Sequence, residues 1–218
     1  MYDEIKCLAI SSGASAFGVG YIDDLRGHFD ALTTQQTDGL IYGISIGVRV
    51  SDVVLKGIIT GPTPHYLHHY RMINMLLDQI ALRLSLVIQS NGYNALPIPA
   101  SQIIDWQKQT AHLSHKMIAI RAGMGWIGRN NLLVHPEHGS RIRLATILTD
   151  MPLEVDKPLD DRDCGNCRRC VDACPVSAIK EDYKEWDKQT CLEKLKSYSK
   201  THNISQYICG LCVKVCNP

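Results

Sequence analysis

The stretch that constrains this sequence most is Cys164-x2-Cys167-x2-Cys170-x3-Cys174-Pro175. Four further cysteines follow within about forty residues, whereas residues 1–163 contain only Cys7. A disulfide framework is typical of small secreted chains in an oxidising compartment. Thiols gathered in one part of a longer chain indicate metal or cluster binding instead, so we expect a metal-binding module at this end.

The spacing of the first four cysteines is that of the run which holds clusters in bacterial ferredoxins. Three cysteines two residues apart wrap a loop around one cuboidal cluster, and the fourth, before a proline, ligates another cluster. The later cysteines complete both sets, which predicts two [4Fe–4S] clusters. Cluster 1 would be held by Cys164, Cys167, Cys170 and Cys216, and cluster 2 by Cys174, Cys191, Cys209 and Cys212.

The second half departs from the ferredoxin repeat, because one cysteine is displaced to Cys191 and Cys216 is followed by Asn217. Zinc remains an alternative, although zinc sites favour two separated Cys-x2-Cys pairs. Disulfides are the other alternative. Cys7 lies among apolar residues with helical spacing, and we expect it to be a buried small hydrophobe.

The composition fits a soluble globular protein, with 218 residues of which 45% are hydrophobic and 21% charged. Lys plus Arg number 23 and Asp plus Glu number 22, so the net charge is +1, which argues against a dedicated nucleic-acid binder. No uncharged apolar run reaches the roughly 18–20 residues that span a bilayer. The start, Met1-Tyr-Asp-Glu, lacks the positive region of a signal peptide. We expect a cytoplasmic protein without a membrane partner.

Periodicity predicts mixed secondary structure before the cysteines. Alternating residues predict strands at 17–22, 40–50 and 141–149, and helical spacing predicts helices over about 65–90 and 101–122. Thr63 and Pro64 are a suitable cap and first position for the longer helix. Its other faces are apolar too, at Met72, Met75, Leu82 and Leu86, which predicts burial on most sides.

Residues 151–163, with two prolines, are the expected linker. The predicted fold is therefore an α/β (α+β) domain over residues 1–155, followed by a small ferredoxin-like two-cluster domain over residues 156–218. Two clusters form a path for electrons, and the path needs a donor, such as a ferredoxin or flavodoxin, and an acceptor. A simple ferredoxin would not need so large a first domain, which favours an acceptor in the same chain.

The segment Ala122-Gly-Met-Gly-Trp-Ile-Gly-Arg-Asn130, followed by His138-Gly139-Ser140 and Leu148-Thr149-Asp150, resembles epoxyqueuosine reductases. These are cobalamin-dependent iron–sulfur enzymes related to reductive dehalogenases. The cysteine order, including Cys191, is similar as well, and the resemblance covers about residues 60–216. It implies a nitroreductase-like first domain that binds a corrinoid (cobalamin), with flavin a less favoured cofactor. It assigns the corrinoid to Gly125, Trp126, Ile127, Gly128, Arg129, Asn130, Gly139 and Ser140.

The sequence departs from the family at two places. The family's catalytic Asp precedes a Ser/Thr-Ala-Pro motif, and the matching stretch here is Gln109-Thr110-Ala111-His112, with Gln in place of the acid. Longer members continue into a helical-repeat region associated with tRNA binding, whereas this sequence stops at Pro218. From these departures and the neutral charge we expect a small-molecule substrate rather than epoxyqueuosine in tRNA, and no nucleic-acid partner.

Candidate catalytic residues are Gln109, His112 and Tyr70, because each lies where it would face the expected substrate site. His115 follows His112 by three residues, so both would lie on one helix face as pocket lining or a proton relay. The alternative from a different class is a non-catalytic ferredoxin-type electron-transfer protein that docks a partner enzyme and binds no corrinoid. The reductase and the electron-transfer protein would have the same cysteine pattern, so this pattern does not distinguish them.

Overall fold

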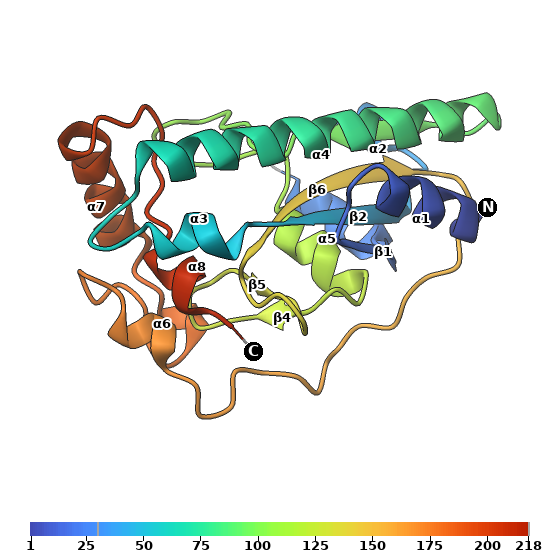
Figure 1. Cartoon of the computed structure of the whole chain (residues 1–218). Helices are drawn as coiled ribbons and strands as arrows, with labels where there is room; N and C mark the ends of the chain where they lie inside the picture. The colour runs from blue at the N-terminus through green and yellow to red at the C-terminus, as the bar shows by residue number, and fades with distance from the viewer. Residues whose placement is uncertain (30, 218) are drawn as a thin grey trace. The chain divides into compact units, whose positions relative to one another are not determined.

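The computed structural model describes residues 1–29 and 31–217 (Figure 1). Two compact units make up the chain, and neither is continuous in sequence. Unit 1 consists of Met1–Val48, Ile73–Met124 and Arg143–Leu159, and unit 2 of Arg49–Met72, Gly125–Ile142 and Asp160–Pro218. This division differs from a single cut at 155/156, because two earlier segments group with the cysteine-rich part. The single cut stays a prediction about which parts fold independently.

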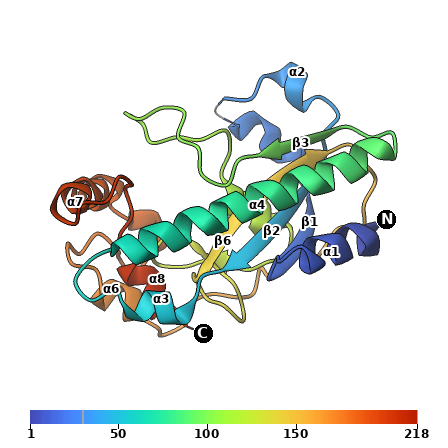
Figure 2. The same ribbon diagram turned by 45° about the horizontal axis from the view of Figure 1, so that its top comes forward.

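The centre of unit 1 is a four-stranded sheet with the strand order β1-β2-β6-β3 (Figure 2). The strands are β1 (Ala16–Tyr21), β2 (Tyr42–Arg49), β3 (Ala95–Ile98) and β6 (Ile142–Thr149). β1 pairs antiparallel with β2, and β3 pairs antiparallel with β6. The three strands expected from alternation are confirmed, and β3, which contains Pro97, lies at an edge where a missing N–H is tolerated.

The longest helix is α4 (Pro64–Ser90), which begins where the Thr63 hydroxyl accepts a hydrogen bond from the Tyr66 N–H at 3.1 Å. Leu77, Ile80, Leu84 and Ile88 on one face are fully buried. The expected burial on most sides is wrong, since a second set of apolar side chains is exposed: Met72, Met75, Leu82 and Leu86. By length and composition alone α4 could cross a membrane, and 39% of its most apolar 18-residue stretch is buried inside the structure.

The second expected helix, over 101–122, is wrong for its first half. Helix α5 runs only from His115 to Arg121. The Asp105 carboxylate accepts hydrogen bonds from the N–H groups of Gln107 and Lys108, at 2.8 and 2.9 Å. Such a local side-chain turn competes with helix formation. Gln109 consequently adopts a left-handed backbone with φ of +52°.

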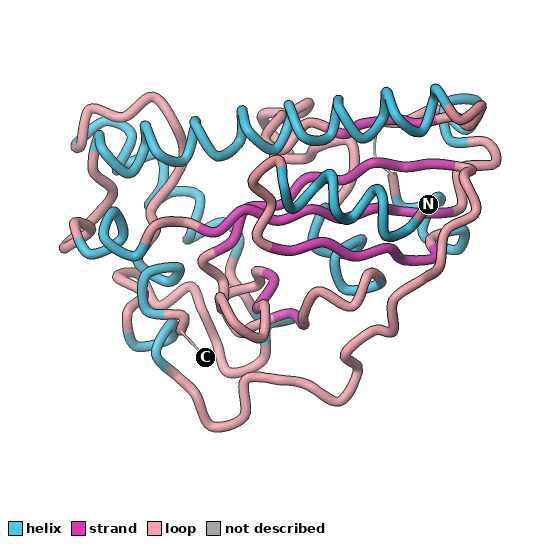
Figure 3. The backbone as a smooth tube through the Cα atoms, turned by 45° about the vertical axis from the view of Figure 1, so that its right-hand side comes forward, coloured by secondary structure: helices cyan, strands magenta, loops and turns pink. Residues whose placement is uncertain are grey.

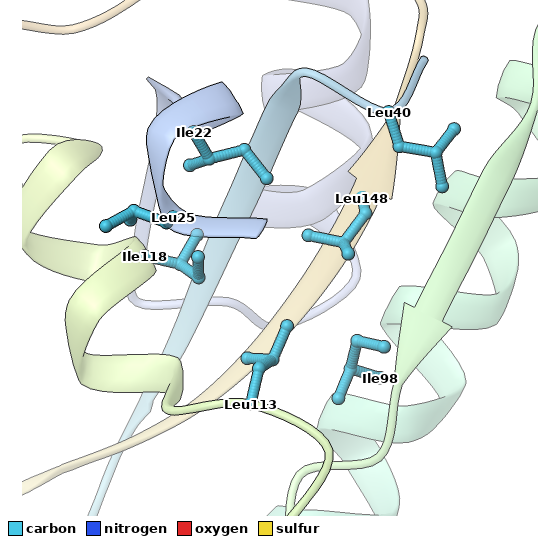
Figure 4. Packing of buried hydrophobic residues seen from close by; sticks show 7 residues of the cluster. All are labelled: Ile22, Leu25, Leu40, Ile98, Leu113, Ile118 and Leu148. Atoms are coloured by element: carbon cyan, nitrogen blue, oxygen red, sulfur yellow. The ribbon is translucent and has the colours of Figure 1, made fainter. Parts of the chain in front are cut away.

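A hydrophobic cluster lies between α5 and the sheet (Figure 4). Its buried members are Ile22, Leu25, Leu40, Ile98, Leu113, Ile118 and Leu148. Gly43 of β2 lets the helix approach closely, because a Cβ there would be 2.7 Å from Cγ2 of Ile118. Smaller elements complete unit 1: α1 (Tyr2–Ser11), the 3-10 helix Asp23–His28 and α2 (Thr34–Thr37).

The expected linker contains no helix or strand, but part of it is held against β1. The backbone N–H of Asp156 donates to the Val19 carbonyl, and its carboxylate accepts the Val19 N–H, both at 2.8 Å. The hydroxyl of Tyr2 also donates to this carboxylate at 2.9 Å. The segment is therefore anchored before the chain enters unit 2.

Unit 2 is built from short elements joined by loops (Figure 3). They are α3 (Asp52–Lys56), β4 (Trp126–Ile127), β5 (Leu133–Val134), α6 (Arg169–Asp172), the 3-10 helix Tyr183–Glu185, α7 (Lys188–Thr201) and α8 (Leu211–Val215). Arg141 donates to the Asp52 carboxylate and to the Lys214 carbonyl, each at 2.9 Å. Tyr198 donates to the Thr60 carbonyl at 2.6 Å. These contacts explain why the segments 49–72 and 125–142 group with the cysteines.

Candidate iron–sulfur centre

The first set of thiols surrounds Cys170 in α6. Burial raises the pKa of Cys170 to about 11, and the neighbouring Cys216, Cys164 and Cys167 raise it further. A thiol responds in this way only to charges that lie close to it. The structure therefore brings together the four cysteines that the spacing grouped in the first set.

The thiols of the second set influence one another in the same way. Burial raises the pKa of Cys191 to about 11, with further contributions from Cys174 and Cys209. The pKa of Cys212 is also raised, by burial and then by the neighbouring cysteines Cys209, Cys191, Cys170 and Cys174. Cys212 thus lies among the other three members of its set. Because Cys170 of the first set also raises the pKa of Cys212, the two sets lie near each other.

Several N–H groups point at these sulfurs. The Ser140 N–H donates to Cys216 Sγ at 3.2 Å, and the Ala178 N–H donates to Cys174 Sγ at 3.3 Å. Arg169 Nε donates to Cys167 Sγ at 3.4 Å, and this bond holds the pKa of Cys167 below its ordinary value. Such donors stabilise thiolates and are among the groups that tune iron–sulfur clusters. The soft sulfur donors and these N–H groups fit the expected clusters.

Two observations concern the alternatives for the cysteines. Among residues 1–29 and 31–217, no three His, Cys, Asp or Glu side chains are placed to hold a single metal ion. Cys7 is exposed on α1, so its expected burial is wrong. The buried residues of that helix are Ile5 and Ala9, each two positions from Cys7, and such neighbours point to different sides of a helix.

The glycines of the Gly125–Asn130 turn and the following hairpin allow protein groups to come close. A Cβ at Gly128 would be 2.5 Å from Val134 Cγ2 and 3.5 Å from Cys164 Sγ. Gly139 has a φ of +58°, and a Cβ there would be 2.3 Å from the Cys216 carbonyl oxygen. Gly139 therefore makes room for the segment that carries Cys216, whereas Gly128 makes room for the Val134 side chain.

Polar side chains of the same turn are also engaged within unit 2. Asn130 and Ser140 are buried and hydrogen-bonded to each other at 3.1 Å. Arg129 donates to the carbonyls of Cys167 and Gly165, both at 2.9 Å. The Trp126 N–H is buried without a partner among the described groups. The assignment of Gly125, Trp126, Ile127, Gly128, Arg129, Asn130, Gly139 and Ser140 to a corrinoid stays a prediction.

The candidate catalytic residues divide between the units, with Gln109 and His112 in unit 1 and Tyr70 in unit 2. The Gln109 amide donates to the Trp106 carbonyl at 2.6 Å, and His112 Nε2 lies 3.1 Å from the Gln102 side-chain oxygen. Gln109 and His112 are not one helical turn apart, because residues 101–114 are not helical. The Tyr70 ring packs edge-on against Tyr66, 6.4 Å between centroids. Their catalytic roles stay predictions.

His115 has a structural role that its spacing from His112 did not indicate. Its Nε2 lies 3.0 Å from the Pro99 carbonyl, and its Nδ1 lies 2.9 Å from the Thr146 hydroxyl. A carbonyl only accepts, so Nε2 carries the proton and Nδ1 accepts from the hydroxyl. Burial lowers the pKa of His115 to about 4, with Arg143 and His112 adding to the effect and the Pro99 bond opposing it. The ring is a neutral link between β6 and the loop before α5.

Comparison with known proteins identifies the cysteine-rich part first. Residues 163–218 match the family described as "4Fe-4S double cluster binding domain". An epoxyqueuosine reductase of Pseudomonas aeruginosa is 30% identical over 151 residues, which are 66% of this chain and 38% of the relative. The enzyme of Listeria monocytogenes is 36% identical over 115 residues, 49% of this chain and 30% of the relative. The chain is therefore similar to epoxyqueuosine reductases, and its cysteine-rich part matches a double-cluster iron–sulfur domain.

Solved structures share the mixed α/β fold of this chain. The epoxyqueuosine reductase of Streptococcus thermophilus superposes with a TM-score of 0.67 at 22% identity, over 98% of this chain and 64% of that one. A reductive dehalogenase described as B12-dependent gives 0.75 at 20% identity, over 97% of this chain and 30% of that one. The chain spans 38% or less of the length of the two sequence relatives above.

Proposed function

We propose that this protein is a reductase that passes electrons from a soluble donor, such as a ferredoxin or flavodoxin, through two [4Fe–4S] clusters. Cluster 1 would be held by Cys164, Cys167, Cys170 and Cys216, and cluster 2 by Cys174, Cys191, Cys209 and Cys212. The observation that supports the proposal is that Cys216, Cys164 and Cys167 raise the pKa of Cys170, whereas Cys174 and Cys209 raise that of Cys191, as close neighbours would.

The cysteine side chains would supply all the ligands of the clusters. Bound clusters supply one-electron carriers. The N–H groups of Ser140 and Ala178 and the guanidinium of Arg169 would stabilise negative charge on the ligand sulfurs, as their bonds to Cys216, Cys174 and Cys167 indicate. The approach of Cys170 to Cys212 supports electron transfer from one set to the other.

The proposed acceptor is a corrinoid in a first domain of nitroreductase-like character. Support comes from the similarity to epoxyqueuosine reductases and from the fold shared with a dehalogenase described as B12-dependent. The side chains that the resemblance assigns to the corrinoid are already bonded within unit 2, and the Trp126 N–H is closed off from solvent. Arg129, Asn130 and Ser140 are therefore committed to other groups of this chain, whereas the Trp126 N–H has no partner among the described groups, and we derive no chemical step through a corrinoid.

Small molecules and epoxyqueuosine in tRNA are both candidate substrates. Our expectation against epoxyqueuosine and nucleic acid has no support, because the sequence relatives are named epoxyqueuosine reductases. One structural neighbour is an epoxyqueuosine reductase bound to an epoxyqueuosine-modified tRNA-Tyr stem loop, with a TM-score of 0.68 at 20% identity over 98% of this chain. Epoxyqueuosine, free and in a tRNA stem loop, belongs among the compounds tested alongside small molecules.

The second candidate is a ferredoxin-type electron-transfer protein without a corrinoid. Arg129, Asn130 and Ser140 favour this candidate, because their side chains already bond to other protein groups rather than to a cofactor. Gln109 in place of an acid favours it as well.

One preparation tests both candidates. Protein purified without oxygen should contain about eight iron atoms per chain, four for each cluster. It is then incubated with hydroxocobalamin and passed through a gel-filtration column. About one retained cobalt per chain, with a changed corrinoid spectrum, supports the reductase. Iron without retained cobalt favours the electron-transfer protein, and protein that cannot be loaded with iron excludes both.

A further inference from the structure

Arg129 makes several hydrogen bonds to the Cys164–Cys167 loop and its surroundings. The expected contact with a corrinoid would not require them. Its Nη1 donates to the Cys167 carbonyl and its Nη2 to the Gly165 carbonyl, both at 2.9 Å. Its Nε donates to the Glu181 carboxylate at 3.1 Å. The side chain is only 18% exposed. Every nitrogen of the guanidinium is therefore directed at a protein group.

The loop that receives these bonds is also held by local hydrogen bonds. Gly165 has a left-handed φ of +49°, and its N–H donates to the Asp163 carboxylate at 2.7 Å. The Cys167 N–H donates to the Cys164 carbonyl at 2.9 Å. The carbonyls of Gly165 and Cys167 accept from Arg129, which lies 36 and 38 residues earlier in the chain. The planar fork of an arginine suits two such acceptors, which a lysine would meet only as a point charge.

The guanidinium also places a positive charge beside Cys167. Its Nη1 lies 2.9 Å from the carbonyl oxygen of Cys167, a proposed ligand of cluster 1. Glu181 offsets part of this charge, and it also pairs with Arg168. A reduced cluster carries one more negative charge than an oxidised one, so a nearby cation stabilises the reduced form.

We propose that Arg129 is a positioning residue for cluster 1: it fixes the Cys164–Cys167 loop through its two carbonyls and raises the reduction potential of that cluster. This replaces the contact with a corrinoid that the family resemblance implied for Arg129. The proposal rests on the proposed assignment of Cys164, Cys167, Cys170 and Cys216 to one cluster.

The test compares the iron-loaded wild-type protein with R129Q, R129K and E181Q. Iron content, EPR spectra of the reduced protein and redox titration are measured without oxygen, and C170S identifies which signal belongs to cluster 1. R129Q removes the charge, so we expect the reduced form of cluster 1 to be disfavoured about tenfold, a shift of about 59 mV to lower potential. Cluster 2 should keep its potential.

The other variants separate charge from geometry. R129K keeps the charge but loses the fork, so its cluster 1 potential should stay near that of wild type while iron is lost several-fold faster to a chelator. E181Q removes the opposing charge, and we expect a smaller shift to higher potential. R26Q is the matched control, because Arg26 likewise bonds a carbonyl, that of Thr37, and a carboxylate, that of Asp23, but lies in unit 1.

The outcomes are distinguishable. Wild-type protein that holds no [4Fe–4S] cluster means that the proposed function fails. If wild type holds two clusters and R129Q leaves both potentials and the EPR spectrum unchanged, the proposal for Arg129 is overturned. An equal shift of both clusters, or the same shift in R26Q, overturns it too. If R129Q does not fold, R129K decides alone: release of iron at the wild-type rate contradicts the positioning role.

Discussion

The two units bury their side chains to different degrees. Among the described residues, the largest side chains that are fully buried belong to unit 1, with the exceptions of Leu55 and Ile58. Unit 1 also has the four-stranded sheet, whereas two helices of unit 2, α6 and α8, have only 4 and 5 residues. Helices this short are not stable by themselves. Unit 2 instead gathers eight cysteines and side chains that bond to loop carbonyls.

This contrast indicates that unit 1 folds through apolar burial, whereas unit 2 depends on its clusters. Small metal-binding modules gain folding free energy from the metal, because the ligand set is not assembled in the unfolded chain.

Removing the iron should affect the two units unequally. Treatment with a chelator and an oxidant should expose the amides of α6, α8 and the Cys164–Cys167 loop to exchange with deuterium. The amides of β2 and β6 should stay protected, because their burial does not involve iron. Hydrogen exchange followed by mass spectrometry measures both in one sample. Equal loss of protection in both units would contradict the division of roles.

Replacing one ligand gives the next largest effect. Cys170→Ser should lose most of the iron of cluster 1, about half of the total, because a serine oxygen is a poor substitute for a thiolate. Iron analysis and EPR check the result, and the remaining signal should be that of cluster 2. Cys7→Ser is the matched control, because Cys7 is exposed and lies in unit 1. A comparable loss of iron in both variants would refute the grouping of the cysteines.

A cavity in unit 1 should lower the stability of the protein without loss of iron. Ile118 is fully buried and packs over Gly43, so Ile118→Ala should reduce the free energy of unfolding by about 2–4 kcal/mol. The iron content should stay that of wild type. Leu86→Ala, at a side chain that is 56% exposed, is the control and should change stability by about 0.5 kcal/mol or less. Denaturant unfolding monitored by circular dichroism, with iron analysis, measures both. Loss of iron in Ile118→Ala would show that the units are not separable in this way.

Local patterns in the sequence were sufficient for three strands of the sheet and for a double cluster domain. Residues that alternate over 40–50 and 141–149 face two sides of a sheet whatever surrounds them, so their strands were predictable. The spacing from Cys164 to Cys174 is itself a property of the loop that wraps a cluster. The match of residues 163–218 to a double cluster domain agrees with that interpretation.

Features that depend on distant contacts were not predictable. Nothing local indicates that Arg141 bonds both Asp52 and Lys214, yet such contacts place residues 49–72 in unit 2. The apolar outer face of α4 looks like a second core face in sequence, because periodicity does not say which faces have neighbours. The helix expected over 101–122 was wrong for another reason. Hydrogen bonds from backbone N–H groups to the Asp105 side chain outweighed the helical pattern.

The smallest predicted effect is a pH dependence confined to unit 1. His115 has a pKa of about 4 in the folded protein, below its ordinary value of 6.5. A histidine with a lowered pKa contributes its full stability above pH 6.5 and loses it as the pH falls towards 4, because the unfolded chain binds the proton first. Wild type should therefore lose about 1–2 kcal/mol between pH 7 and pH 5 through this residue.

His115→Gln isolates that contribution, because a glutamine amide can still donate to the Pro99 carbonyl but does not titrate. At pH 7 the variant should be less stable than wild type, since it loses the contact with Thr146. At pH 5 the difference should shrink by about 1–2 kcal/mol, which thermal unfolding at the two pH values measures. Loss of iron in acid affects both proteins alike and cancels in the comparison. A difference that stays constant with pH would mean that the pKa of His115 is the same in the folded and the unfolded chain, so that the link between Pro99 and Thr146 does not require the neutral ring.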